Sequence, residues 1–168
     1  MGDETADCFG LVCGMALSAC SGLPEQWGGT PAPNPAPNPD AEVVMVRPDA
    51  EVMTKQALPN FVGISEASAG SSAISMNMVI IPPGGRADPH VHKGYESAIY
   101  VMEGEVETRY GPGLTKSMTN KAGDFIFIPA DVPHQPINLS KTKRAVAIVS
   151  RNDANEQESV EHYDPATK

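Results

Sequence analysis

Two histidines separated by one residue are the most chemically suggestive feature of this 168-residue chain. They are His90 and His92 in the stretch DPHVHKGYESAIYVMEG, and the whole chain contains only four histidines. Because successive side chains of a β-strand face opposite ways, an extended backbone places both imidazoles on one face. Neutral imidazole is a common ligand of transition metals. The spacing therefore indicates part of a metal site.

Short strands joined by turns are the elements expected to position these side chains. The chain contains 16 prolines and 15 glycines and few long apolar patterns of helical period, which favours an all-β domain. Four stretches are predicted to form strands, namely residues 75–81, 97–111, 125–128 and 144–150. Strands at this spacing are typical of a sandwich or barrel.

Two of these stretches are continuously apolar. The segments FIFI (125–128) and AVAIV (145–149) contain no polar residue. Such runs predict strands that are buried on both faces. In a small barrel, burial of the outer face implies a partner, so the sequence predicts a homodimer.

Length and charge restrict the classes of function. A chain of 168 residues is sufficient for one domain with a proper core and short for two. Its 21 acidic and 12 basic residues give a formal net charge of −9. Binding to a phosphate backbone needs clustered Lys and Arg, so nucleic acid is not an expected partner.

The first 20 residues are predicted to be a lipoprotein signal peptide. Residues 9–19, FGLVCGMALSA, have the length of a signal-peptide core, and residues 17–20, LSAC, resemble a bacterial lipobox. Such a motif would place a lipid anchor at Cys20 and the protein in the cell envelope. No Lys or Arg precedes the apolar core, so an incidental apolar tail on a cytoplasmic protein is the alternative.

The rest of the chain divides by composition. Residues 21–41 contain the segment PAPNPAPNP and are predicted to be an extended, disordered linker. The folded domain is predicted at residues 42–160, followed by a C-terminal tail at 161–168. All three cysteines lie within the first 20 residues, which leaves the domain without a disulfide.

Two motifs in the predicted domain resemble those of the cupin superfamily. The first is formed by Gly84, His90, His92, Glu96 and Gly104. The second is formed by Gly123, Pro129, His134 and Asn138. The resemblance implies a double-stranded β-helix, the jelly-roll barrel of small single-domain bacterial cupins. It also implies a divalent transition metal, with Mn, Fe, Co, Ni, Cu and Zn left open, bound by His90, His92, Glu96 and His134.

Two positions depart from the family pattern. Asp131 replaces a glycine, at a turn position that Asp tolerates. Glu96 lies eight residues before Gly104, where seven is usual, so that strand alternation favours Ser97 as the inward residue. A carboxylate is nevertheless the better metal ligand, and Gly94 in the preceding loop permits a shift of register. We therefore predict that Glu96 points inward and that Ser97 faces outward or into the packing of the sheet.

The sequence leaves two possible roles for Asp88. Asp88 shares the predicted face of His90 and can hold an imidazole N–H, but it precedes Pro89 and can equally form a turn.

The expected function is that of a metal-binding protein that acts on or binds a small molecule. One hypothesis is an enzyme, such as a dioxygenase or an isomerase-like enzyme, that uses the open positions of the metal. A second is a non-catalytic module that binds or senses a small ligand, and a third is a structural domain without metal. The residues identify no substrate and no catalytic side chain, because a fold does not carry a function with it.

Overall fold

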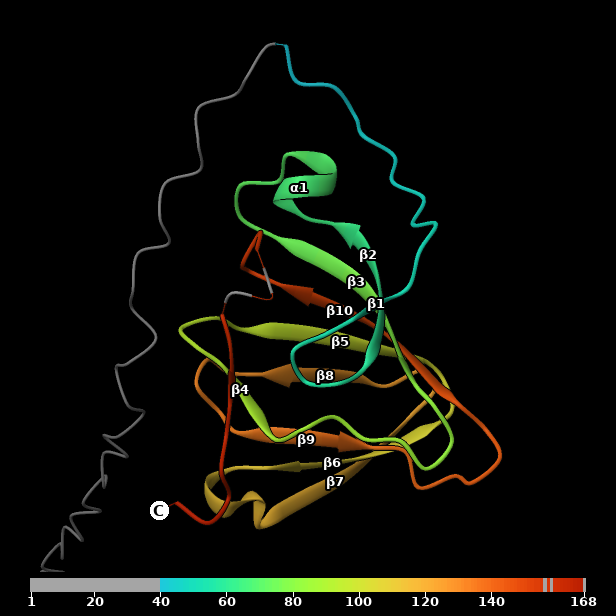
Figure 1. Ribbon diagram of the computed structural model, residues 1–168, viewed down its shortest axis with the longest axis vertical. Helices are drawn as coiled ribbons and strands as arrows, with labels where there is room; N and C mark the ends of the chain where they lie inside the picture. The colour runs from blue at the N-terminus through green and yellow to red at the C-terminus, as the bar shows by residue number, and fades with distance from the viewer. Residues whose placement is uncertain (1–39, 156, 158, 168) are drawn as a thin grey trace, which may run out of the picture. The chain divides into compact units, whose positions relative to one another are not determined.

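The computed structural model describes residues 40–155, 157 and 159–167 (Figure 1). The predicted signal peptide and residues 21–39 of the predicted linker lie outside these described residues. Residues Glu42–Lys168 form one compact unit. Within the described part of the chain, no helix is long and apolar enough to cross a membrane.

The compact unit consists of two antiparallel sheets (Figure 1). The six-stranded sheet contains, in spatial order, β1 (Val52–Met53), β2 (Pro59–Ile64), β3 (Ser75–Ile81), β10 (Ala145–Arg151), β5 (Ser97–Glu103) and β8 (Phe125–Ile128). The five-stranded sheet contains β11 (Val160–His162), β4 (His90–His92), β9 (His134–Ile137), β6 (Glu105–Tyr110) and β7 (Lys116–Lys121). The helical turns are α1 (Glu66–Ala69) and the 3-10 turn η1 (Pro112–Leu114).

This arrangement confirms the predicted all-β, double-stranded β-helix of jelly-roll type. The chain crosses repeatedly between the two sheets, so that neighbours in a sheet are distant in sequence, as β3, β10 and β5 are. All four predicted strand segments form strands, and the segment 97–111 forms two. The boundaries predicted for the linker, the domain and the tail stay predictions, although β11 extends to His162, beyond residue 160.

Within the single chain, the FIFI segment is buried on one face. In β8 the side chains alternate, with Ile128 buried and Phe125 and Phe127 exposed by 83% and 54%. Within the described residues no further layer covers the outer face of this edge strand, so only one of its faces is buried. β10 differs because it lies in the middle of its sheet, between β3 and β5, and has no exposed residue.

Gly104 makes the tight connection between β5 and β6. Its φ of +83° is rare for residues with a side chain. A Cβ at this position would lie 2.6 Å from the carbonyl oxygen of Arg144 and 2.9 Å from Cα of Ala145. The glycine of the first motif is therefore required by both the conformation and the close approach of the neighbouring chain.

Apolar side chains from both sheets pack between them. The hydrophobic core contains Leu58, Ile81, Ala87, Val106 and Ala145. Each of these side chains is at most 6% exposed. The core thus joins β3 and β10 of one sheet to β6 of the other.

Candidate metal centre

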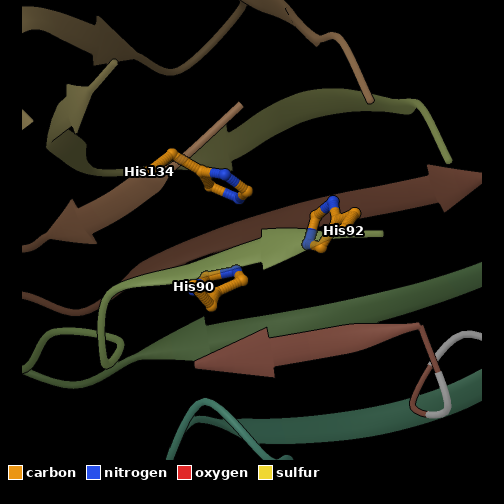
Figure 2. A group of neighbouring side chains, drawn as sticks. All are labelled: His90, His92 and His134. Atoms are coloured by element: carbon orange, nitrogen blue, oxygen red, sulfur yellow. The ribbon is translucent and has the colours of Figure 1, made fainter. Parts of the chain in front are cut away.

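Strand pairing brings three of the four predicted ligands together. His90 and His92 lie on β4, and His134 begins β9, where it is the direct cross-strand neighbour of His90. Each of the three is only 3% exposed. Their candidate ligand nitrogens all lie within 4.8 Å of one another, and the rings face a common space (Figure 2).

Backbone carbonyls fix the tautomers of two histidines. Nδ1 of His90 lies 2.7 Å from the carbonyl oxygen of Asp88, and Nδ1 of His134 lies 2.9 Å from that of Val132. A carbonyl only accepts hydrogen bonds, so each Nδ1 carries the proton. Each Nε2 therefore keeps its lone pair, the state that a metal ligand needs. Asp88 supports His90 as one reading suggested, but through its carbonyl group, and its side chain is exposed.

His92 is oriented by two side chains. Nη2 of Arg151 lies 2.7 Å from its Nε2, and Oγ of Ser97 lies 2.9 Å from its Nδ1. Arginine only donates hydrogen bonds, so Nε2 of His92 accepts and Nδ1 donates to Ser97. Nε of Arg151 also donates to Oγ of Ser97, at 3.1 Å. His92 thus has the same tautomer as the other two histidines.

Burial keeps all three imidazoles neutral. It lowers the pKa of His90 to about 3, with His134 adding to the effect, and lowers the pKa of His134 to about 4. The pKa of His92 is also lowered, by burial first and then by the charge of Arg151. Neutral nitrogen donors are therefore present at neutral pH without the cost of deprotonating a ligand.

We expect the metal-free protein to lose stability as the pH falls from about 6.5 to about 4. In that range the unfolded chain binds protons on histidines of ordinary pKa, whereas the folded chain holds His134 neutral down to a pKa of about 4. The unfolded state binds more protons, so acid favours it, by roughly 3 kcal/mol for His134 alone. Urea unfolding at several pH values checks this. A His134→Gln variant should show a weaker pH dependence, and an unchanged dependence would contradict the assignment.

The predicted inward orientation of Glu96 is wrong. Glu96 is exposed, and its backbone N–H donates to Oδ1 of Asn152 at 2.8 Å. Ser97 instead begins β5, is 1% exposed and points to His92. Gly94 has a φ of +76° and forms the turn after β4, but no shift of register follows. The alternation of the strand therefore outweighs the chemical preference for a carboxylate.

Substitutions at the adjacent positions 96 and 97 should differ in their effect on metal affinity. Glu96→Gln should leave metal affinity within about twofold, because its side chain lies outside the site. Ser97→Ala should lower metal affinity by about 10- to 100-fold, since residues that orient a ligand histidine have effects of this size. Titration of each metal-free variant with a competing chelator measures both. A loss of affinity in Glu96→Gln alone would show that the carboxylate reaches the metal.

Asp131 and Asn138 of the second motif do not line the metal centre but stabilise the chain around it. Asp131, at the position of the family glycine, has a φ of +61°. Its carboxylate accepts from the N–H of Gly94 at 3.3 Å and pairs with Lys93 at 3.2 Å. The tolerance expected of Asp at this turn is confirmed. Asn138 is 1% exposed and bonds to backbone groups only.

The three histidines open onto a cavity of about 80 Å³ between the sheets. Its walls are largely apolar, with Val79, Ile99, Val101, Ile126, Ile128 and Val149 among the lining residues. Arg151 lines the same cavity and is 3% exposed. Sequence reasoning missed this residue. The available signal was its alternation with Ala147 and Val149, which also line the cavity.

Comparison with known proteins gives consistent matches. Residues 77–150 match the family model described as "Cupin domain". The chain is 35% identical over 100 residues to germin-like protein subfamily T member 3 of Arabidopsis thaliana, covering 56% of this chain and 43% of that protein.

Solved structures show the same likeness. Oxalate oxidase in complex with glycolate is 29% identical, with a TM-score of 0.53 over 61% of this chain and 54% of that one. The polyketide cyclase RemF of Streptomyces resistomycificus is 22% identical, with a TM-score of 0.57 over 74% of this chain and 85% of that one, which shows a likeness of fold alone. The chain thus spans about half the length of the germin-like protein and of oxalate oxidase.

Proposed function

This chain belongs to the cupin superfamily, and from that premise we propose that His90, His92 and His134 bind a divalent transition metal and that the cavity beside them binds a small carboxylate. The observation that carries the proposal is the placement of three buried, neutral imidazoles next to a guanidinium at the wall of one cavity. Each part of this set has a separate chemical consequence.

The donor set suits a first-row metal. Three neutral imidazole nitrogens fit Mn, Fe, Co, Ni, Cu or Zn, and they do not select among them. Three protein ligands leave coordination positions open, as in catalytic rather than structural sites. When bound there, the metal would supply a Lewis acid. The protein's own contribution is to hold the imidazoles neutral and oriented through Asp88, Val132 and Ser97.

Arg151 favours an anionic ligand. Its guanidinium lies 2.7 Å from His92, so a ligand at the histidines also meets a group that stays charged at every relevant pH. The planar guanidinium matches the two oxygens of a carboxylate. The apolar walls suit a short carbon skeleton and keep water out. The similar oxalate oxidase is described in complex with glycolate, a small carboxylate, which supports this ligand class.

Two candidate activities share this site. An enzyme, either a dioxygenase or an isomerase-like enzyme, would convert the bound carboxylate. A non-catalytic module would bind or sense it. In either case the guanidinium of Arg151 must move away from Nε2 of His92 when the metal binds, because it occupies the lone pair of that nitrogen in the metal-free protein.

Binding of glycolate and oxalate to the metal-loaded protein, measured by calorimetry, tests the proposal. Arg151→Met should weaken both by about tenfold or more while metal content is retained, because a charge-assisted bond is lost. Arg109→Met, which removes an exposed arginine paired with Glu107, should change neither. Equal binding by Arg151→Met and the wild type would contradict the proposal. Oxygen uptake and product analysis with the bound acid then separate the enzyme from the binding module.

We also propose a lipid anchor at Cys20 and location in the cell envelope. The support is the LSAC sequence at residues 17–20, which precedes the proline-rich segment. In a bacterial host, the full-length chain should fractionate with membranes, and Cys20→Ser should remain uncleaved or be released. Recovery of the wild type in the soluble fraction with Met1 intact would exclude the anchor and leave the cytoplasmic alternative.

A homodimer is a further proposal. Its support is the apolar outer face of β5 and β8, where Tyr100, Phe125 and Phe127 are exposed by 40%, 83% and 54%. The rings of Tyr100 and Phe125 are 4.8 Å apart, so these side chains form a continuous surface.

A further inference from the structure

Two buried side-chain amides line the cavity without using their full hydrogen-bonding capacity. Gln56 is 7% exposed and Asn60 is 2% exposed, and both line the cavity of the histidines. Oε1 of Gln56 and Oδ1 of Asn60 have no hydrogen-bond partner. Among the buried side-chain atoms of the described residues, this holds otherwise only for Oγ of Ser75, which does not line the cavity. Buried polar atoms nearly always have a hydrogen-bond partner. Two amide oxygens without one in the same cavity therefore suggest a functional role.

The other polar residues of the cavity wall behave differently. Oδ1 of Asn77 accepts from the N–H of Gly63 at 3.2 Å. Oγ1 of Thr108 donates to Asn120 at 2.7 Å, and Oγ1 of Thr54 donates to the carbonyl group of Leu58 at 3.0 Å. These side chains hold the barrel together. Gln56 and Asn60 stand apart, because their amide oxygens make no such bond.

The backbone holds the two amides in place. Thr54 and Leu58 close a loop around Gln56, with the N–H of Leu58 donating to Oγ1 of Thr54 at 3.1 Å. The carbonyl oxygen of Gln56 accepts from the N–H of Asp88 at 2.8 Å, and Asp88 in turn accepts from His90 at 2.7 Å. Asn60 lies on β2, paired with Val79 of β3, another cavity residue. The amides therefore belong to the same rigid frame as the histidines.

We infer that Gln56 and Asn60 bind hydroxyl groups of the ligand, so that the small carboxylate is a hydroxy acid. This inference rests on the proposed function for the carboxylate end of the ligand. A side-chain amide presents an oxygen that accepts a hydrogen bond or, when the amide group is rotated by 180°, an NH₂ group that donates one. A hydroxyl group can pair with either. An aliphatic acid without hydroxyl groups would leave both amide oxygens without a partner.

The size of the cavity agrees with such a ligand. At about 30 Å³ per water molecule, a volume of about 80 Å³ corresponds to the space of roughly three water molecules. A hydroxy acid of two to three carbons is at the limit of what this space admits. Its carboxylate can lie at Arg151 and the histidines while its hydroxyl groups lie among the amides.

The first arm of the test measures the thermal stability of the metal-free, ligand-free variants. Asn60→Leu and Gln56→Met replace each amide by an apolar side chain of similar size, and neither should lower Tm, because an unpaired buried polar group is removed. Asn77→Leu is the matched control from the same cavity wall. It should lower Tm by about 3 °C or more, since the N–H of Gly63 loses its acceptor. A loss of this size in both Asn60→Leu and Gln56→Met would assign the two amides a structural role and overturn the inference.

The second arm measures binding of glycerate and propionate to the zinc-loaded protein by calorimetry. Zn²⁺ is used because it has no redox chemistry. The two acids have the same carbon skeleton and differ only in hydroxyl groups. The wild type should prefer glycerate by about tenfold or more, because sites built to bond a hydroxyl group reject the analogue without it. Asn60→Leu and Gln56→Met should each reduce this preference while leaving the affinity for propionate unchanged.

The outcomes separate the two proposals. Propionate binding that depends on Arg151, with no preference for glycerate, would support the proposed function and overturn this inference. A preference for glycerate that both variants retain would overturn it as well. Failure of the wild type to bind either acid would overturn both the proposed carboxylate site and the inference built on it.

Discussion

Replacing His134 with alanine is expected to lower metal affinity by about 100-fold or more while the β-fold is retained. His134 is one of three buried donors, and its loss leaves two imidazoles on a single strand. Two ligands cannot hold a divalent ion against water as three do. The fold should persist, because its core of Leu58, Ile81 and Val106 does not include the histidines. Bound metal after dialysis and the far-UV circular dichroism spectrum check the two halves of this prediction.

His162→Ala is the matched control for His134→Ala. His162 lies on β11 directly opposite His90, but it is exposed and does not belong to the three-histidine group. Its removal should change bound metal by less than about twofold. Full occupancy in His134→Ala, or an equal loss in His162→Ala, would contradict the assignment of the ligands.

Asn138→Ala should destabilise the protein by roughly 3–5 kcal/mol, because it removes all the side-chain hydrogen bonds of one fully buried amide. Nδ2 of Asn138 lies 3.0, 3.1 and 2.8 Å from the carbonyl oxygens of Ile81, Pro82 and Lys143. Its Oδ1 accepts from the N–H of Ser140 at 3.0 Å. One side chain thus ties the end of β3 to the segment that leads into β10. Chemical denaturation of the metal-free protein measures the loss.

The neighbouring Leu139→Ala variant provides the comparison for Asn138→Ala. Leu139 is 64% exposed, so its truncation should change the free energy of unfolding by about 0.5 kcal/mol or less. Metal affinity of the folded fraction should be unaffected by either change. A specific loss of metal in Asn138→Ala at full stability would mean that the asparagine belongs to the metal centre and not to the frame.

The fold could be predicted because its pattern repeats along the chain. Alternation in strands, turn residues and two motifs in order all indicate the same jelly roll, and Gly104 and Asp131 take the backbone conformations expected of turn residues. His90, His92 and His134 converge as the motifs imply. These features depend on local sequence and on pairing that the fold class already defines.

The error at Glu96 arises because two local rules compete. Ligand chemistry favours Glu96 as the inward residue, whereas strand alternation favours Ser97. The structure follows the alternation, because Ser97 is paired with Arg151 on one side and with Ile128 on the other. For β8, the apolar run predicts a covered outer face, and in the single chain Phe125 is exposed on that face, so its cover stays a prediction.

The cavity residues were missed for a different reason. Arg151, Gln56 and Asn60 lie far from the motifs in sequence. Arg151 and Asn60 reach the cavity through the pairing of β10 and β2 with their neighbours, and Gln56 reaches it from the loop between β1 and β2. Each type of residue is usually found on the surface, so composition predicts exposure for all three. Only the folded arrangement shows that they are buried beside the histidines.

The metal content of the untagged, purified protein tests the central claim most directly. Elemental analysis, followed by titration of the metal-free protein with Mn, Fe, Co, Ni, Cu and Zn ions, should find about one divalent ion per chain for at least one of these metals. Binding should disappear in the variant that combines His90→Ala with His134→Ala. A protein that carries no metal, and takes up none of the six ions more tightly than this double variant does, would contradict the assignment of His90, His92 and His134 as a metal centre.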